Sequence, residues 1–208
     1  MKLVVLGATG GTGLEIVHQA IEHGHQVTAF VRNPQGLKLF GDLIAVIQGD
    51  LLNNGELGKA IQGQDAVLSG FGPRYPVSKD ESDLLERFAV ALTSAMGHVG
   101  VKRVAVESTA FLFRDSYVPP TYLVGRLFFP GTVDDATAME QIIGKSGLDW
   151  TIVRPPRLTD KPYTGKYRVR EGHLPSFGFT ISRADVADFM IETVEKRKSI
   201  GQVVGICN

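Results

Sequence analysis

The chain has few of the features that mark several classes of protein. Its 208 residues include one cysteine, Cys207, which excludes an intramolecular disulfide and favours a reducing compartment. Lysine and arginine total 22, as do aspartate and glutamate, so nothing indicates a nucleic-acid partner or binding to an acidic membrane surface. No apolar run reaches the roughly 18 residues of a transmembrane helix, and the N-terminal run is too short for a signal-peptide core. We therefore expect a soluble cytoplasmic protein that acts on a small-molecule substrate.

The start of the chain carries a glycine-rich turn between an apolar strand and a helix. After Lys2, residues 3–6 are apolar and include two β-branched valines, and three glycines follow at Gly7, Gly10 and Gly13. Gly7 would let the chain turn sharply, Gly10 would let backbone approach a phosphate, and Gly13 would let the helix pack closely on the sheet. Because the N–H groups at a helix N-terminus favour an anion, the pattern predicts a bound dinucleotide. A glycine turn that serves packing alone is the alternative.

Strand-like and helix-like segments alternate from there to the end of the chain. Further strands are expected at residues 26–31, 43–48, 65–69, 102–107, 149–154 and 202–207. Helices are expected after the glycines and at residues 33–40, 54–61, 80–99, 133–145 and 183–196. Repeated βα units predict an α/β fold, a Rossmann-like doubly wound parallel sheet with helices on both faces, in a single domain spanning residues 1–208.

Two long stretches interrupt this alternation. Residues 111–131 are rich in aromatics and proline, and residues 155–180 in proline, glycine and tyrosine. Both follow strands at their carboxyl ends, where open α/β sheets bind ligands. We expect loops 109–132 and 155–181 to form the substrate side, with a lid or an oligomer contact as the alternative. A monomer is expected, and a weak dimer through the apolar segment 121–130 remains open.

The end of the second strand indicates which dinucleotide is bound. NAD-binding units usually place an acid there for the ribose hydroxyls, but this chain has Arg32, whose planar fork suits a 2′-phosphate. This favours NADP(H) as the cofactor, and a surface arginine without a ligand is the alternative. Asp50 follows the third strand and is placed to meet the adenine, unless it caps a helix.

These residues resemble the atypical short-chain dehydrogenase/reductase superfamily, and within it the biliverdin IXβ reductase and NADPH-dependent flavin reductase family. The resemblance covers almost the whole chain and is carried by these motifs in order: GATGGTG at 7–13, VR at 31–32, GD at 49–50, GQDAV at 63–67, STAFL at 108–112, VPP at 118–120, DD at 134–135, RPP at 154–156 and ISRAD at 181–185. It implies a reductase that transfers hydride from NADPH to a flavin such as FMN or riboflavin, and to biliverdin-type tetrapyrroles or quinones. The flavin would be a substrate and not a prosthetic group.

The resemblance also implies a set of site residues. Those that would bind the cofactor are Gly7, Thr9, Gly10, Gly11, Thr12, Gly13, Arg32, Asp50, Leu51, Gly72, Arg74, Ser108, Thr109, Pro155 and Pro156. Those that would form the substrate pocket are Phe111, Phe113, Tyr122, Arg157 and Leu158. Arg157 stands where the best-known relatives have histidine, and residues 121–133 form a longer, more apolar segment than in those relatives, so the substrate preference of this chain can differ.

The expected chemistry has no tyrosine–lysine pair. Tyr75 and Lys79 have the spacing of the short-chain dehydrogenase dyad, but they follow the fourth strand, and Pro76 forces Tyr75 out of helical geometry. Thr109 could orient the nicotinamide amide or donate a proton to the acceptor, or its hydroxyl could be tied to backbone. Arg157 could pair with an acceptor carboxylate or phosphate, or be a solvated arginine. Both are candidate catalytic residues.

Other readings of the sequence remain open. Some other members of the superfamily bind NADP without turnover and regulate partners as redox sensors, and the apolar segment 121–130 could serve such contacts. An isomerase or dehydratase of sugar nucleotides is disfavoured because the tyrosine dyad is missing. The five histidines show no metal-ligand spacing, so we expect no metal.

Overall fold

The fold is built on a central sheet of eight strands. The computed structural model describes residues 1–73, 82–116 and 118–208. The order across the sheet is β3-β2-β1-β4-β5-β6-β10-β8. In chain order these strands are β1 (Lys2–Leu6), β2 (Gln26–Val31), β3 (Ile44–Gln48), β4 (Ala66–Ser69), β5 (Arg103–Glu107), β6 (Asp149–Arg154), β8 (Arg168–Glu171) and β10 (Gln202–Cys207). The strand order reverses between β1 and β4, the position at which open parallel sheets bind ligands.

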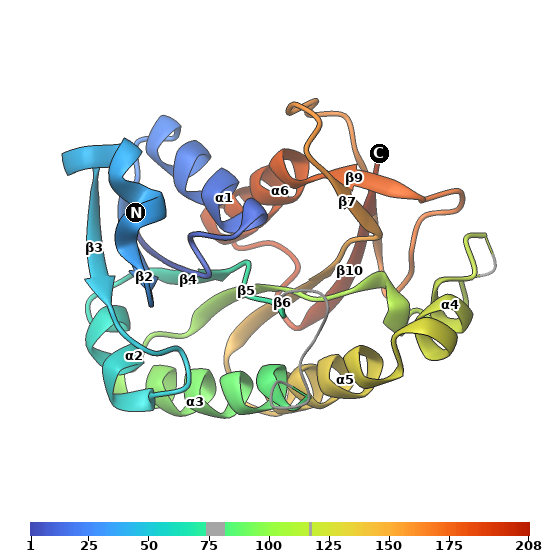
Figure 1. Ribbon diagram of the computed structural model, residues 1–208, viewed down its shortest axis with the longest axis horizontal. Coiled ribbons are helices and arrows are strands. Elements are labelled where there is room, and N and C mark those ends of the chain that lie inside the picture. Colours follow the sequence, from blue (N-terminus) through green and yellow to red (C-terminus); the bar gives the residue numbers. More distant parts are fainter. Residues whose placement is uncertain (74–81, 117) are drawn as a thin grey trace.

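Helices cover both faces of this sheet (Figure 1). On one face lie α1 (Gly11–Glu22) and α6 (Arg183–Glu195), and on the other lie α2 (Asn54–Ile61), α3 (Leu84–Val99) and α5 (Pro130–Gly144). Side chains of β1 alternate between the two resulting cores: Leu3 and Val5 pack in one, Val4 and Leu6 in the other. A central parallel strand is buried on both faces, which explains why β1 is apolar throughout after Lys2. Within the described residues, no helix is both long and apolar enough to span a bilayer.

The predicted fold class is confirmed, with one exception in the direction of a strand. All neighbouring strands of the large sheet pair in parallel except β8, which is antiparallel to β10 at the edge. A second sheet pairs β7 (Arg157–Thr159) with β9 (Thr180–Ser182). The predicted irregular stretch 155–180 therefore contains the short strands β7 and β8, and β9 begins at its last residue.

The predicted irregular stretch 111–131 is largely helical. It contains the end of the 3-10 helix η3 (Ala110–Leu112) and the whole of α4 (Thr121–Phe128), and α5 begins within it at Pro130. Proline is tolerated in the first turn of a helix, so the prolines that interrupt the sequence pattern mark helix starts here. The helix predicted at 33–40 is also a 3-10 helix, η1 (Pro34–Leu43).

The glycine-rich turn has the geometry expected from its sequence. Gly7 has a φ of +71°, and a Cβ built on it would lie 2.8 Å from the backbone of Phe71. A Cβ on Gly13 would lie 2.1 Å from the carbonyl oxygen of Gly7, so α1 can approach the end of β1 only with glycine there. The turn thereby brings the N-terminus of α1 to the carboxyl edge of the sheet, between β1 and β4.

Candidate cofactor and substrate site

A large cavity opens at the carboxyl ends of the central strands. Its volume is about 1240 Å³, above the range of roughly 300–1,000 Å³ typical for one small ligand. Predicted site residues that line it are Gly7, Thr9, Gly10, Gly11, Thr12, Arg32, Leu51, Gly72, Ser108, Thr109, Phe111, Pro155, Pro156, Arg157 and Leu158. The cavity thus joins the predicted cofactor residues to the predicted substrate residues in one continuous space.

The N-terminus of α1 provides the anion-binding end of this cavity. Gly10 is the N-cap residue, no side chain caps the helix, and its first turn holds no acid. The first N–H groups of a helix have no partner within it, and they favour a negative charge together with the helix dipole. A phosphate fits here, because Gly10 and Gly11 both line the cavity and have no side chains of their own to fill the space.

Arg183 places a positive charge beside this helix N-terminus, and the sequence did not predict it. Its side chain lies across the turn, since a Cβ on Gly11 would be 2.6 Å from the Arg183 Cδ. Arg183 lines the cavity and is paired with Asp160. As the first residue of α6, it is brought to the glycines only by the packing of α6 beside α1.

Arg32 directly follows β2 and lines the cavity, as a 2′-phosphate contact requires.

Asp50, in contrast, does not line the cavity among the described residues. Its carboxylate accepts the backbone N–H of Leu52 at 3.0 Å, and its own N–H donates to Glu56 at 2.8 Å. Leu51 is therefore the residue of this turn that lines the cavity.

Glu107 is a titratable residue in the cavity that sequence reasoning also missed. It ends β5 and lines the cavity near Thr12. Burial raises the pKa of Glu107 to about 7, against the opposing effects of a hydrogen bond from Thr12 and the positive charge of Arg183. A carboxyl directly after the apolar residues 104–106 was the only sequence signal for it.

The hydroxyls of Ser108 and Thr109 have different partners. The Thr109 oxygen accepts the backbone N–H of Phe111 at 3.2 Å, which leaves the hydroxyl proton to donate. Ser108 donates to Glu140 at 2.5 Å, and Glu140 also accepts from the Arg154 Nε at 2.9 Å. Thr109 is therefore the hydroxyl of this pair that has a proton available for a ligand.

Two of the predicted pocket aromatics lie outside the large cavity. Phe113 is 1% exposed, and the Arg154 guanidinium lies over its ring at 4.8 Å from the centroid. Tyr122 lines a smaller neighbouring cavity. Phe111 does line the large cavity, and its ring stacks on that of Phe129 with centroids 5.4 Å apart. Phe113 packs in a small core with Ala110 and Leu174, and Tyr122 faces the smaller cavity, so neither lines the large cavity, and their predicted roles in the substrate pocket stay predictions.

Other predicted residues are placed as follows. Gly13 packs against the backbone of Gly7 and Ala8 and, among the described residues, does not line the cavity. Arg74, Tyr75 and Lys79 lie outside the described residues, so their predicted roles stay predictions.

A cluster of possible metal ligands lies outside the cavity. His23, His25 and Glu195 bring ligand atoms within 4.8 Å of one another. His25 and Glu195 are 170 positions apart, so spacing in the sequence could not reveal the cluster. The Glu195 carboxylate lies 2.7 Å from the His25 Nε2 and 3.1 Å from the His23 Nδ1, so both imidazoles already pair with this carboxylate.

A family model described as NAD(P)H-binding matches residues 7–197. Among curated proteins, YwnB of Bacillus subtilis is 38% identical, with 94% of this chain and 92% of YwnB covered. A chloroplast protein of Arabidopsis thaliana is 31% identical, with 99% and 76% covered. The (4-alkanoyl-5-oxo-2,5-dihydrofuran-3-yl)methyl phosphate reductase of Streptomyces griseus is 29% identical, with 74% of this chain but only 46% of that enzyme covered.

Solved structures share the fold over the whole chain. A short-chain dehydrogenase/reductase of Veillonella parvula, solved in complex with NADP, has a TM-score of 0.84 at 16% identity, with 100% of this chain and 94% of that chain covered. ChuY, an anaerobilin reductase of Escherichia coli O157:H7, has a TM-score of 0.80 at 19% identity, with 100% and 97% covered. At these identities the likeness concerns the fold.

Proposed function

Because the chain belongs to the NAD(P)H-binding family, we propose that it is an NADPH-dependent reductase whose acceptor is a flavin such as FMN or riboflavin. Biliverdin-type tetrapyrroles and quinones are further acceptors within the proposal. The observation that carries it is the single cavity of about 1240 Å³, which joins an anion-binding helix N-terminus to an aromatic end. The name of the Streptomyces griseus relative supports a reductase as the class of enzyme.

The cofactor end of the cavity fits NADPH better than NADH. The uncapped N-terminus of α1 suits the pyrophosphate, and Arg32 suits a 2′-phosphate at the end of β2, where an acid would favour NADH. Leu51 and Gly72 would lie along the adenosine half. Pro155 and Pro156, which follow β6, would lie at the nicotinamide end.

The chain's own contribution to the reaction is positioning. The nicotinamide supplies the hydride when it is bound, and the acceptor carries its own reactivity. Thr109 would orient the nicotinamide amide through its available hydroxyl proton, or donate that proton to the acceptor. The stacked rings of Phe111 and Phe129 give the acceptor an apolar wall that keeps water out.

The acceptor end is formed by the loops 109–132 and 155–181. Thr121 and Val124 from α4 line it together with Leu158 and Phe179 from the second loop. Arg157 is exposed, lines the cavity, and would pair with a carboxylate or phosphate of the acceptor. An aromatic wall beside a cation matches FMN, which has a planar ring and a phosphate.

A redox-sensing regulator that binds NADP without turnover is the second candidate. Its support is the outer side of α4, where Leu123 is 57%, Leu127 66% and Phe128 71% exposed. Such an apolar surface is typical of a protein contact, and the same surface would form the weak dimer of an otherwise monomeric protein.

We also propose that the protein works in the cytoplasm and that its main partner is a small-molecule substrate.

Turnover separates the two candidates. Purified protein is mixed with NADPH and with FMN, riboflavin, biliverdin or a quinone, and loss of the NADPH absorbance is followed. Turnover with at least one acceptor, and much less with NADH, supports the reductase. NADPH binding without turnover of any acceptor supports the sensor, and absence of NADPH binding contradicts both.

A further inference from the structure

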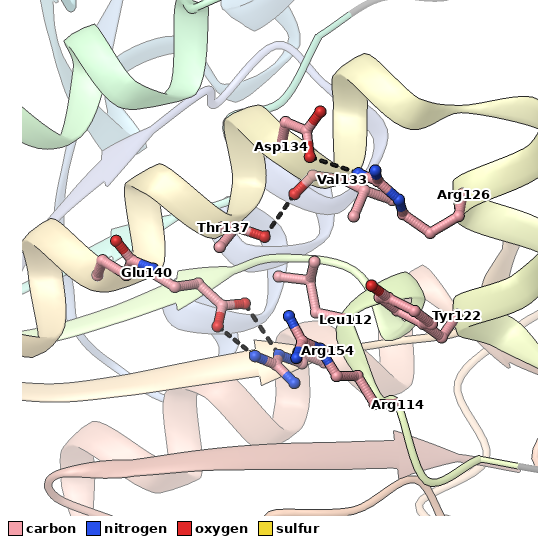
Figure 2. A pocket seen from close by; sticks show the side chains of 10 residues that line it. Leu112, Arg114, Tyr122, Arg126, Val133, Asp134, Thr137, Glu140 and Arg154 are labelled. Carbon is pink, nitrogen blue, oxygen red and sulfur yellow. Dashed lines mark hydrogen bonds and ion pairs between the residues drawn. The ribbon is translucent and has the colours of Figure 1, made fainter.

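A second cavity lies behind the wall of the large one, between α4, α5 and the end of β6 (Figure 2). Its volume is about 520 Å³, within the range that holds a small organic ligand. Thr121 and Tyr122 are neighbours on α4 but face different cavities, and so do Ala136 and Thr137 on α5. None of the described residues lines both cavities. The second cavity is therefore a separate compartment.

The charges around this cavity leave one arginine without a carboxylate. Arg154 is paired with Glu140, and Arg126 with Asp134. No carboxylate in the described part of the chain is paired with Arg114, which is exposed and lines the cavity. With three arginines and two carboxylates on its wall, the cavity favours a negatively charged occupant.

Arg114 is held in place by an aromatic ring. Its guanidinium carbon lies 5.4 Å from the centroid of the Tyr122 ring, a cation–π distance. Figure 2 shows Arg114, Arg154 and Tyr122 turned toward the same space. The phenol of Tyr122 adds a hydrogen-bond donor to the two guanidinium groups.

Arg154 presents donors to the cavity even though it is paired. Glu140 engages its Nε and one terminal nitrogen. The other terminal nitrogen contacts no acceptor among the described residues, so its N–H groups remain for a ligand. Arginine binds carboxylate and phosphate through such planar pairs of donors.

We propose that the second cavity binds a small organic anion through a carboxylate or phosphate group, held by Arg114 and Arg154. The ligand is a molecule other than the cofactor and the hydride acceptor, because the two compartments share no described wall residue. The site does not depend on the reductase proposal, since its charge and shape are independent of what the large cavity binds.

Calorimetric titration at low ionic strength tests the site. The protein is first saturated with NADP⁺, so that the cofactor end of the large cavity is filled, and is then titrated with citrate and separately with inorganic phosphate. We expect binding of at least one of these anions, weakened about tenfold or more in Arg114→Gln, since an arginine–anion hydrogen bond of this kind is lost. Arg87→Gln is the matched control, because Arg87 lies on α3 and lines neither cavity.

The outcomes separate as follows. Preference for citrate assigns a carboxylate ligand, and preference for phosphate assigns a phosphate ligand. No binding of either anion, equal weakening in Arg114→Gln and Arg87→Gln, or binding unchanged in Arg114→Gln overturns the proposal. The preceding NADP⁺ titration reports on the cofactor site alone, so failure of the proposed function is seen separately.

Discussion

Removing the Glu140 carboxylate should destabilise the protein more than any comparable surface change. Glu140 lies on α5 with a side chain 8% exposed, and its partner Arg154 is 15% exposed. Its oxygens accept from both Arg154 and the Ser108 hydroxyl. In Glu140→Ala, the Arg154 charge stays buried without its carboxylate, and the Ser108 hydroxyl loses its acceptor.

The expected size of this effect follows from the burial. Breaking a buried ion pair by removing one partner costs about 3–5 kcal/mol, and we expect the lower end because Arg154 retains some solvent contact. With a urea slope of about 2 kcal/mol per molar, a loss of about 3 kcal/mol lowers the unfolding midpoint by about 1.5 M. Urea unfolding followed by circular dichroism measures this midpoint directly.

Asp134→Ala on the same helix is the matched control. Asp134 is 71% exposed and its partner Arg126 is 44% exposed, so this pair contributes no more than about 1 kcal/mol. The double variant Glu140→Leu, Arg154→Met should recover most of the loss, because no charge is left buried. The reasoning is refuted if Glu140→Ala costs no more than Asp134→Ala.

Three further predictions concern the large cavity. Arg32→Ala should weaken NADPH binding by roughly ten- to a hundredfold and leave NADH binding nearly unchanged, as fluorescence titration would show; equal losses would remove the 2′-phosphate assignment. Thr109→Ala should lower flavin turnover by about tenfold or less with NADPH affinity unchanged, since general acid catalysis typically contributes 10²–10⁴-fold and orientation less; complete loss of hydride transfer would make Thr109 a proton donor. Because the folded state raises the Glu107 pKa from 4.5 to about 7, it binds more protons than the unfolded state in this range, and stability should fall as pH rises from about 5 to 7. Glu107→Gln should flatten that part of the stability curve, and an unchanged curve would contradict the raised pKa.

Local patterns were enough to predict the fold around the glycines. The alternation of an apolar strand, three glycines and a helix predicted β1 and α1, and the structure shows why Gly7 and Gly13 are required there. The edge strand β8 was missed because its sequence, RVRE, is exposed throughout and lacks an apolar face. The helix α4 was missed because prolines flank it, although each proline stands at or just before a helix start.

The candidate site was predictable where backbone geometry defines it and less so where side chains meet from distant segments. Aromatic composition predicted an apolar pocket, but the wall formed by η3 and α4 decides that Phe111 faces the large cavity while Tyr122 faces the small one. Arg183 reaches the glycine turn only because α6 packs beside α1. Such placements depend on packing between elements, which no local pattern encodes.

Anaerobic reduction of FMN by NADPH tests the central claim most directly. Oxidised flavin loses its visible absorbance when it accepts hydride, so the rate can be followed with and without the protein under identical conditions. The reductase proposal predicts rapid bleaching that depends on protein concentration and is saturable in NADPH, with much slower bleaching by NADH. Tight NADPH binding with FMN bleaching no faster than in buffer would contradict it.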